Sequence, residues 1–350
     1  MKSTNVVPKV TIMVINYNGK KWLEQCFRSL AKTSYENTEI CLVDNASNDG
    51  SLELVRQEFP NVSIIQHDRN YGFAEGYNRA IQMVDADYIL LLNNDTQIID
   101  SNWVSVMVNA MQEDNKVAAI ACKMLSMENP KLIDSIGGRC YWWTRGFPIG
   151  LDEEDNGQYD SPRVEPFNVC AGAALVRRDA FTEVGGFDSA MFAAYEDLDL
   201  CWRLRLRGYS ISYVPSAVVL HYLSGSWGPR IAAKAYWGPR NFLRSMLKNY
   251  SAKSLIKALP NYILYTIVVR MLGYLFWFRM PLAAWATLKA VLWNIANLPD
   301  TLRERHKIQS TRMIPDEKII QAMGSHGREP LYQMLTQANK LIRLHSRRKE

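Results

Sequence analysis

The sequence predicts an α/β protein with a mostly parallel central sheet flanked by helices, followed by a helical C-terminal extension. Short apolar runs alternate with helical patterns through the first half of the chain. This alternation is typical of βαβ units, which build parallel sheets. From about residue 230 the pattern changes to long helices rich in Trp, Leu and Lys. We therefore expect two domains, residues 1–228 and residues 229–350.

The expected elements follow one another closely. In the first part, strands are expected at 10–15, 39–43, 62–67, 88–92 and 117–122, and helices at 22–33, 51–59, 75–84 and 103–112. Residues 137–168 hold Gly, Pro and the acidic run 152–155, and we expect a surface loop beside the sheet. The pattern then resumes with a strand at 173–176, a helix at 178–184, and strands at 210–214 and 218–220.

Charge divides the chain at the same boundary. Residues 1–228 hold 20 Lys and Arg against 29 Asp and Glu, a net charge of −9, and residues 229–350 hold 21 against 6, a net charge of +15. A basic segment suits nucleic acid or an anionic membrane surface, and the apolar content of residues 262–298 favours the membrane. Six scattered cysteines without a CxxC pair predict reduced, buried thiols of a cytoplasmic protein. The N-terminus has no apolar signal segment, so export is not expected.

The C-terminal part is apolar but interrupted. Arg270, Arg279, Pro281 and Lys289 break the run 258–298, and the longest charge-free stretch, 258–269, is shorter than the ~20 residues of a membrane span. We expect two helices that lie in the membrane interface or pack as a hairpin, with Lys and Arg reaching the headgroups. Helices packed on the preceding α/β part are the alternative.

Polar residues follow the expected strands. Asp44 ends the strand 39–43, and Asn93, Asn94 and Asp95 follow the strand 88–92. Parallel α/β sheets bind ligands outside the carboxyl ends of their strands. Asp95 offers the oxygen ligand that Mg²⁺ or Mn²⁺ prefers. These positions predict a ligand site at one edge of the sheet.

An acidic cluster and a distant histidine complete a candidate group-transfer site. Glu196, Asp197 and Asp199 open a helical pattern, and His221 follows the strand 218–220. One carboxylate can help to hold a hard cation against a diphosphate, while another takes a proton from an acceptor hydroxyl. Asp199 is expected to stabilise the first turn of this helix, because a negative charge there interacts favourably with the helix dipole.

In this order, the motifs resemble family 2 glycosyltransferases of the GT-A fold. The matching segments are 10–18, 42–51, 70–78, 93–95, 185–188 and 196–197. The resemblance extends over about the first 225 residues. It implies transfer of a sugar from a nucleotide-diphosphate donor with the aid of Mn²⁺ or Mg²⁺.

The resemblance also implies a role for each matching residue. Asp44 would bind the nucleotide base, Asn93 a ribose hydroxyl, Asp95 and His221 the metal, and Asp197 would be the catalytic base, with Glu196 placing the acceptor. The other implied donor-binding residues are Ile15, Tyr17, Gly72, Asn78 and Asn94. Asn93-Asn94-Asp95 departs from the Asp-x-Asp more usual in this fold, so the diphosphate must supply further metal ligands. Three aromatic residues are candidates for stacking on an acceptor sugar or for packing: Trp142, Trp143 and Trp227.

The interpretation is an inverting glycosyltransferase for bacterial surface-polysaccharide assembly, peripheral at the cytoplasmic face of the inner membrane. Its partners would be a nucleotide-diphosphate sugar, a glycan or lipid-linked acceptor and anionic lipid, with no nucleic acid, and a homo-oligomer is compatible with it. The basic helical tail and Asn-Asn-Asp resemble bacterial rhamnosyltransferase-type members, which implies dTDP-rhamnose as donor. The alternatives are a sugar nucleotidyltransferase and a non-catalytic, membrane-bound scaffold that binds nucleotide sugars.

Overall fold

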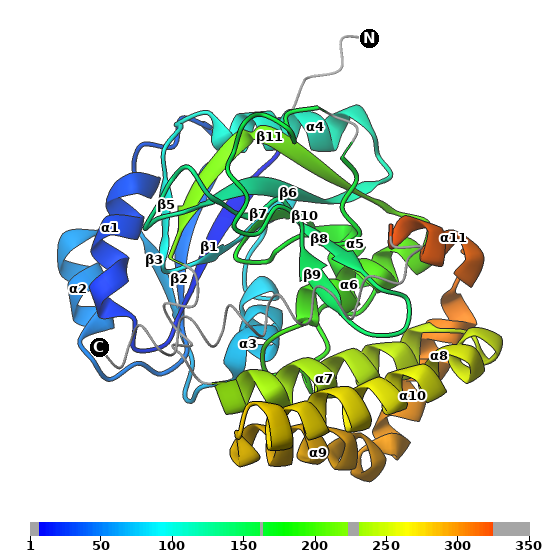
Figure 1. The fold of residues 1–350 in the computed structure, drawn as a ribbon. Helices are drawn as coiled ribbons and strands as arrows, with labels where there is room; N and C mark the ends of the chain where they lie inside the picture. Colours follow the sequence, from blue (N-terminus) through cyan, green and yellow to red (C-terminus); the bar gives the residue numbers. More distant parts are fainter. Residues whose placement is uncertain (1–6, 162–163, 223–230, 325–350) are drawn as a thin grey trace.

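The protein is a mixed α/β sheet domain with a layer of C-terminal helices beneath it (Figure 1). The computed structural model describes residues 7–161, 164–222 and 231–324. The nine-stranded sheet has the order β3-β2-β1-β4-β10-β6-β11-β5, with β7 paired to β6. Its strands are β1 (Val10–Asn16), β2 (Thr38–Asp44), β3 (Ser63–Gln66), β4 (Tyr88–Asn93), β5 (Thr96–Ile98), β6 (Val117–Ser126), β7 (Ile133–Ser135), β10 (Ala173–Arg177) and β11 (Ser210–His221).

The sheet is parallel on one side and mixed on the other. Strands β3, β2, β1 and β4 run parallel, as the βαβ pattern predicts. Strand β10 is antiparallel to both of its neighbours, and β5 is antiparallel to β11. The two strands expected at 210–214 and 218–220 form the single strand β11, whose pairing with β6 shifts register between Val214 and Val218.

Helices cover both faces of the sheet because each strand sends alternate side chains to opposite sides. In β1, Ile12 and Val14 point into the core beneath the first group of helices, whereas Met13 and Ile15 point into the core on the other face. The first group comprises α1 (Lys20–Leu30), α2 (Ser51–Glu58) and α4 (Trp103–Glu113), and the second comprises α3 (Gly72–Ile81), α5 (Arg178–Glu183) and α6 (Glu196–Leu206).

The segment 137–168 is not simply a surface loop, so that expectation was wrong. It contains a two-stranded hairpin, β8 (Gly138–Cys140) and β9 (Gly146–Pro148). Phe167 is fully buried, with its ring 6.0 Å from that of Trp202 on α6. Apolar residues within the irregular stretch therefore belong to the core.

Four C-terminal helices form a layer (Figure 1): α7 (Ile231–Asn249), α8 (Ala252–Leu264), α9 (Pro281–Ala296) and α10 (Leu298–Thr311). The last helix, α11 (Asp316–Ala322), packs against α6. Helix α8 continues through π-helical turns to Trp277, so one helix of 26 residues, Ala252–Trp277, is long and apolar enough to cross a membrane by length and composition. The charge-free run had suggested a shorter apolar segment. After a turn at Met280, α9 packs back against this helix as a hairpin.

The C-terminal helices also share a core with the sheet domain. Trp202 and Leu198 of α6 pack in one cluster with Phe242 and Met246 of α7. The boundary drawn after residue 228 therefore marks a change in sequence pattern and does not separate two independent cores.

Candidate active site

Three side chains form a hydrogen-bonded row across the carboxyl ends of neighbouring strands. Asn16 at the end of β1 donates from Nδ2 to Asp44 Oδ1 at the end of β2 (3.1 Å), and its Oδ1 accepts from Asn94 Nδ2 (2.6 Å). The other oxygen of Asp44 accepts the backbone N–H of Ser47 (2.9 Å). Asp44 is fully buried, so these bonds satisfy and fix its carboxylate. The sequence analysis missed Asn16, whose only signal was its place at a strand end.

Ile15 and Tyr17 flank Asn16 and differ in exposure. Ile15 is buried in the core, and Tyr17 is half exposed just beyond the end of β1. Tyr17 is therefore the more accessible of the two for a planar ligand group.

Gly72 starts α3 beside this row. Its carbonyl accepts from Asn45 Nδ2 (2.9 Å), and its N–H donates to Asn70 Oδ1 (2.8 Å). A Cβ at this position would lie 2.5 Å from the Phe192 carbonyl oxygen, and φ is +76°. Close approach of the Phe192 backbone thus explains why a glycine occupies the position.

Asn78 lies in the same helix but is engaged elsewhere. Its Nδ2 donates to the Phe187 carbonyl and its Oδ1 accepts the Phe187 N–H, both at 2.8 Å. The structure therefore brings Asp44, Asn94 and Gly72 near one another, while the Asn78 side chain holds the turn at Phe187.

Asp95 and His221 meet where β5 pairs with β11. His221 Nε2 lies 3.3 Å from Asp95 Oδ1 and 3.3 Å from Asn93 Nδ2. Asp95 Oδ1 is buried and accepts no hydrogen bond from the part of the chain that the structure describes. A buried carboxylate oxygen beside an imidazole nitrogen fits a divalent cation. Within the described ranges, however, no group of three or more Asp, Glu, His or Cys side chains is arranged so that it could hold a metal ion by itself.

Asp134, on β7, holds the far side of the His221 ring and was missed by the sequence analysis. Its Oδ2 lies 2.6 Å from His221 Nδ1. Burial alone would lower the pKa of His221, but the carboxylates of Asp134 and Asp95 outweigh burial and raise that pKa to about 9. A proton held on Nδ1 by Asp134 leaves Nε2 as the nitrogen that faces Asp95.

Glu196 and Asp197 begin α6 on the other side of Asn93. The Asp197 carboxylate accepts a hydrogen bond from the N–H of Ala171 (3.3 Å). The residue after Ala171, Gly172, accepts a hydrogen bond at its carbonyl from the N–H of Asn93 (2.9 Å). Burial raises the pKa of Asp197, although bonds from backbone N–H groups oppose it. Burial and the charge of Asp197 raise the pKa of Glu196 well above its ordinary value. A carboxylate with a raised pKa suits proton abstraction near neutral pH.

A strained turn precedes this acidic pair. Ala194 and Tyr195 have φ values of 70° and 68°, a left-handed conformation that is costly for residues other than glycine. Asn241 of α7 holds this turn, because its Nδ2 donates to the carbonyls of Ala193 (3.0 Å) and Ala194 (2.6 Å). A helix from the C-terminal part therefore fixes the backbone just before the acidic pair.

Asp199 lies in the first turn of α6, where it was expected, and it also forms buried ion pairs. It is fully buried and pairs with Arg203 (2.9 Å) and with Lys248 of α7 (3.1 Å). Asp188 pairs with the same Lys248 and with Arg244. These five side chains, which we call the α7 ion cluster, link α7 to both ends of the segment 188–199 that carries Asp197.

The candidate acceptor aromatics pack against the C-terminal helices. The Trp142 carbonyl accepts from the hydroxyl of Tyr250, and the Trp143 ring lies edge-on to Tyr265 at 6.1 Å. Trp142 and Trp143 remain half-buried. Trp227 lies outside the described residues.

The chain is similar in sequence to two bacterial glycosyltransferases. An N-acetylglucosaminyl-diphospho-decaprenol L-rhamnosyltransferase of Mycobacterium tuberculosis is 29% identical over 64% of this chain and 78% of its own length. A poly-beta-1,6-N-acetyl-D-glucosamine synthase of Staphylococcus aureus is 27% identical over 73% of this chain, which spans 60% of that longer protein.

Two solved structures have the same fold. A mannosyltransferase from Pyrobaculum calidifontis in complex with GDP-Man and Mn²⁺ aligns with 91% of this chain and 87% of its own (TM-score 0.54, 15% identity). GalNAc-T7 with UDP, GalNAc and Mn²⁺ aligns with 71% of this chain and 49% of its own (TM-score 0.58, 16% identity). These likenesses show the GT-A fold. The model of glycosyl transferase family 2 matches residues 11–185, half of the chain, and the protein therefore belongs to this family of glycosyltransferases.

Proposed function

We propose that the protein is an inverting glycosyltransferase that moves a sugar from a nucleotide-diphosphate donor to a lipid-linked glycan in bacterial surface-polysaccharide assembly. The observation that carries the proposal is the convergence of Asp44, the Asp95–His221 pair and Asp197 at one edge of the sheet. dTDP-rhamnose is the leading donor. Its support is the relative named as a rhamnosyltransferase, whose acceptor is a diphospho-decaprenol.

The chemistry follows from the buried carboxylates. In its ionised form Asp197 takes the proton of an acceptor hydroxyl as that oxygen bonds to the anomeric carbon. The bond from the anomeric carbon to the diphosphate breaks, and the nucleoside diphosphate leaves with the electron pair. Glu196, whose buried Oε2 has no hydrogen-bond partner among the described residues, would orient the acceptor.

Asp95 and His221 would hold a divalent metal, Mn²⁺ or Mg²⁺. Asp95 Oδ1, which accepts no hydrogen bond among the described residues, and His221 Nε2 would be its protein ligands, and donor phosphate oxygens would supply the others, as is common for Mg²⁺. When bound, such a metal neutralises the charge that develops on the leaving diphosphate. Asp44 and Asn94 would bind the nucleoside beside it.

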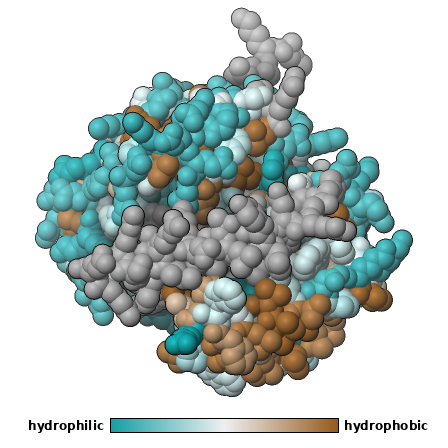
Figure 2. Space-filling model, in the orientation of Figure 1, coloured by the Kyte–Doolittle hydropathy of each residue, from teal (hydrophilic) through white to brown (hydrophobic). Residues whose placement is uncertain are grey.

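The C-terminal helices would attach the enzyme to an anionic membrane surface. Figure 2 shows apolar residues gathered on one side of the molecule, over the C-terminal helices. This apolar face comprises Ile256, Leu264, Val268, Phe276, Trp277, Leu282, Trp285, Leu292 and Ile295, each at least 45% exposed. Exposed Lys253, Lys257 and Arg279 lie among them. Such a surface suits peripheral binding at the cytoplasmic leaflet.

A donor screen with an Asp197→Asn variant tests the proposal. We expect one nucleotide sugar, with dTDP-rhamnose first, to raise the melting temperature in the presence of Mn²⁺ and to be consumed with acceptor. Asp197→Asn should reduce transfer by roughly 10²-fold or more while donor binding is retained. Near-normal transfer by this variant would remove Asp197 from the mechanism, and donor binding without any turnover in the wild type would favour a scaffold.

A further inference from the structure

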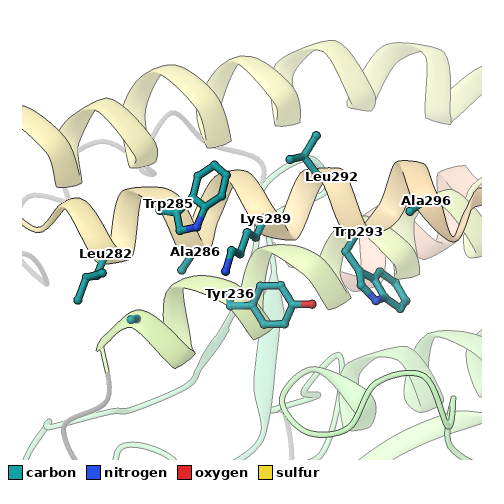
Figure 3. Close-up of a pocket in the computed structure, with 9 residues that line it drawn as sticks. Tyr236, Leu282, Trp285, Ala286, Lys289, Leu292, Trp293 and Ala296 are labelled. Atoms are coloured by element: carbon teal, nitrogen blue, oxygen red, sulfur yellow. The ribbon is translucent and has the colours of Figure 1, made fainter.

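An apolar groove opens between α7 and α9, away from the sheet edge that carries the donor site. It has a volume of about 700 Å³ and is lined by Tyr236 and Ala232 of α7 and by Leu282, Trp285, Ala286, Lys289, Leu292, Trp293 and Ala296 of α9 (Figure 3). The volume lies within the roughly 300–1,000 Å³ that is typical of small-molecule sites. The groove is also continuous with the apolar face, because Leu282, Trp285 and Leu292 belong to both.

The chemistry of the groove favours a hydrocarbon chain over a peptide. Its walls are two helices, whose backbone N–H and C=O groups are already bonded within each helix. An extended peptide in the groove would therefore leave its own amide groups without partners, at a cost in free energy. An isoprenoid or acyl chain has no such groups, and burial of its apolar surface is favourable.

Lys289 gives the groove a charge. It is the one ionisable residue among those that line it, apart from the tyrosine hydroxyl. Among the described residues its ammonium group forms no ion pair, and it lies 5.5 Å from the ring centroid of Trp285. A cation on the rim of an apolar groove matches an amphiphile with an anionic head.

Helix α7 connects the groove to the left-handed turn at Ala194 and Tyr195, which precedes the acidic pair and which we call the catalytic turn. Tyr236 faces the groove, whereas the ring of the next residue, Trp237, stacks on the ring of Phe192 with their centroids 5.4 Å apart. Phe192 in turn packs against Gly72. A Cβ added at Gly238 would lie 3.5 Å from the ring of Tyr195, the residue directly before the acidic pair, so the α7 backbone passes close to that ring. The groove and the catalytic turn are thus separated by a single helix, which is ~10 Å thick.

We propose that this groove holds the isoprenoid chain of a phosphorylated lipid acceptor, with Lys289 at its phosphate. The inference rests on the proposed lipid-linked acceptor and adds the place where the lipid binds. A lipid seated there would keep its head group within a helix diameter of Asp197 while the apolar face contacts the bilayer.

Calorimetric titration of the full chain with farnesyl diphosphate, a soluble C15 probe, tests the groove. Ala232→Phe and Ala296→Phe fill it from its two helices, and each should weaken binding by about tenfold or more. Lys289→Gln should lower the affinity for farnesyl diphosphate by about tenfold but leave the affinity for farnesol unchanged. Ile256→Ser, on the apolar face but outside the groove, is the matched control and should bind the probe normally.

Three results would overturn the inference. The first is an unchanged affinity for farnesyl diphosphate in both filling variants, with circular dichroism showing that they are folded. The others are displacement of the probe by dTDP, and an equal affinity of the wild type for farnesol and farnesyl diphosphate. Donor binding to the same proteins separates this inference from the proposed function. If the wild type binds no nucleotide sugar, the proposed function fails whatever the probe does. If donor transfer is intact and the filling variants still bind the probe, only the groove assignment fails.

Discussion

Replacement of Lys248 by Met should destabilise the protein through the α7 ion cluster. The Lys248 ammonium is the group that contacts both Asp188 and Asp199, and its side chain is only 2% exposed. Methionine keeps most of the apolar stem but removes the charge. Removal of one partner from a buried ion pair costs about 3–5 kcal/mol, because a charge is left uncompensated. Since Asp188 keeps Arg244 and Asp199 keeps Arg203, we expect the lower end, about 3 kcal/mol.

The loss should depend on pH. Burial alone would raise the pKa values of Asp188 and Asp199, but the charges of Lys248 and its neighbouring arginines outweigh burial and hold both values below the ordinary one. Stabilisation by these carboxylates is therefore fully present above the unfolded pKa of ~3.9 and is lost as pH falls toward the lower folded values. The unfolded state titrates alike in both proteins, so the difference between wild type and Lys248→Met should be largest at neutral pH. It should narrow as Asp188 and Asp199 become protonated in the folded variant, in which loss of the Lys248 charge raises the pKa values of both carboxyls.

Urea denaturation from pH 7 to pH 3 measures both effects. Lys307→Met is the matched control, because Lys307 is 71% exposed and pairs with Glu304 within one helix, and it should change the unfolding free energy by less than about 0.5 kcal/mol. Lys248→Met should also lose transferase activity below its melting temperature, since the cluster brackets the segment that carries Asp197. Wild-type stability of Lys248→Met at pH 7, or a difference that persists unchanged to pH 3, would refute the reasoning.

Three further predictions concern the metal, the catalytic turn and the membrane. Asp134→Asn should weaken Mn²⁺ binding in the presence of nucleoside diphosphate by about 10–100-fold, measured by electron paramagnetic resonance of free Mn²⁺, because His221 loses the partner that orients its ring; transfer that survives EDTA would contradict the metal site itself. Asn241→Leu should lower kcat with little change in donor affinity, because the left-handed turn before Glu196 loses two hydrogen bonds; a rise in donor Kd with normal kcat would place its effect elsewhere. Leu264→Ser combined with Phe276→Ser should reduce co-sedimentation with anionic vesicles, and salt should reduce that of the wild type; equal sedimentation of variant and wild type would mean that the apolar face does not meet the bilayer.

The change in charge after residue 228 suggests a truncation there, but such a truncation is a poor test of membrane binding. The deletion would remove the Asn241, Arg244 and Lys248 side chains that hold the turn and pair with Asp188 and Asp199. Phe242 and Met246 would also leave the core that they share with Trp202. Point substitutions on the exposed face keep these contacts, so they separate membrane binding from folding.

Local pattern was sufficient for the parallel half of the fold and for part of the site. Buried strands such as Val10–Asn16 and Tyr88–Asn93 are continuous apolar runs, so their place and their polar ends could be predicted from the sequence. Asp44 and Asp95 became candidates for this reason, and the acidic opening of α6 made Asp197 a candidate. Strand β10 was expected at 173–176, but its antiparallel direction could not be predicted, because an apolar run of five residues is compatible with either direction.

The tertiary structure decided which distant residues support these groups. Asp134 reaches His221 from 87 positions away, and Lys248 reaches Asp199 from 49. Neither residue belongs to a recognisable local pattern. A lysine within a basic helical sequence is predicted to be exposed to solvent, and only the structure shows that Lys248 is buried. The same holds for Asn241 and the groove beside Lys289, which exist only once α7 packs between the sheet domain and α9. Sequence periodicity reports which face of an element is buried, whereas the partner across that face is determined by how the whole chain packs.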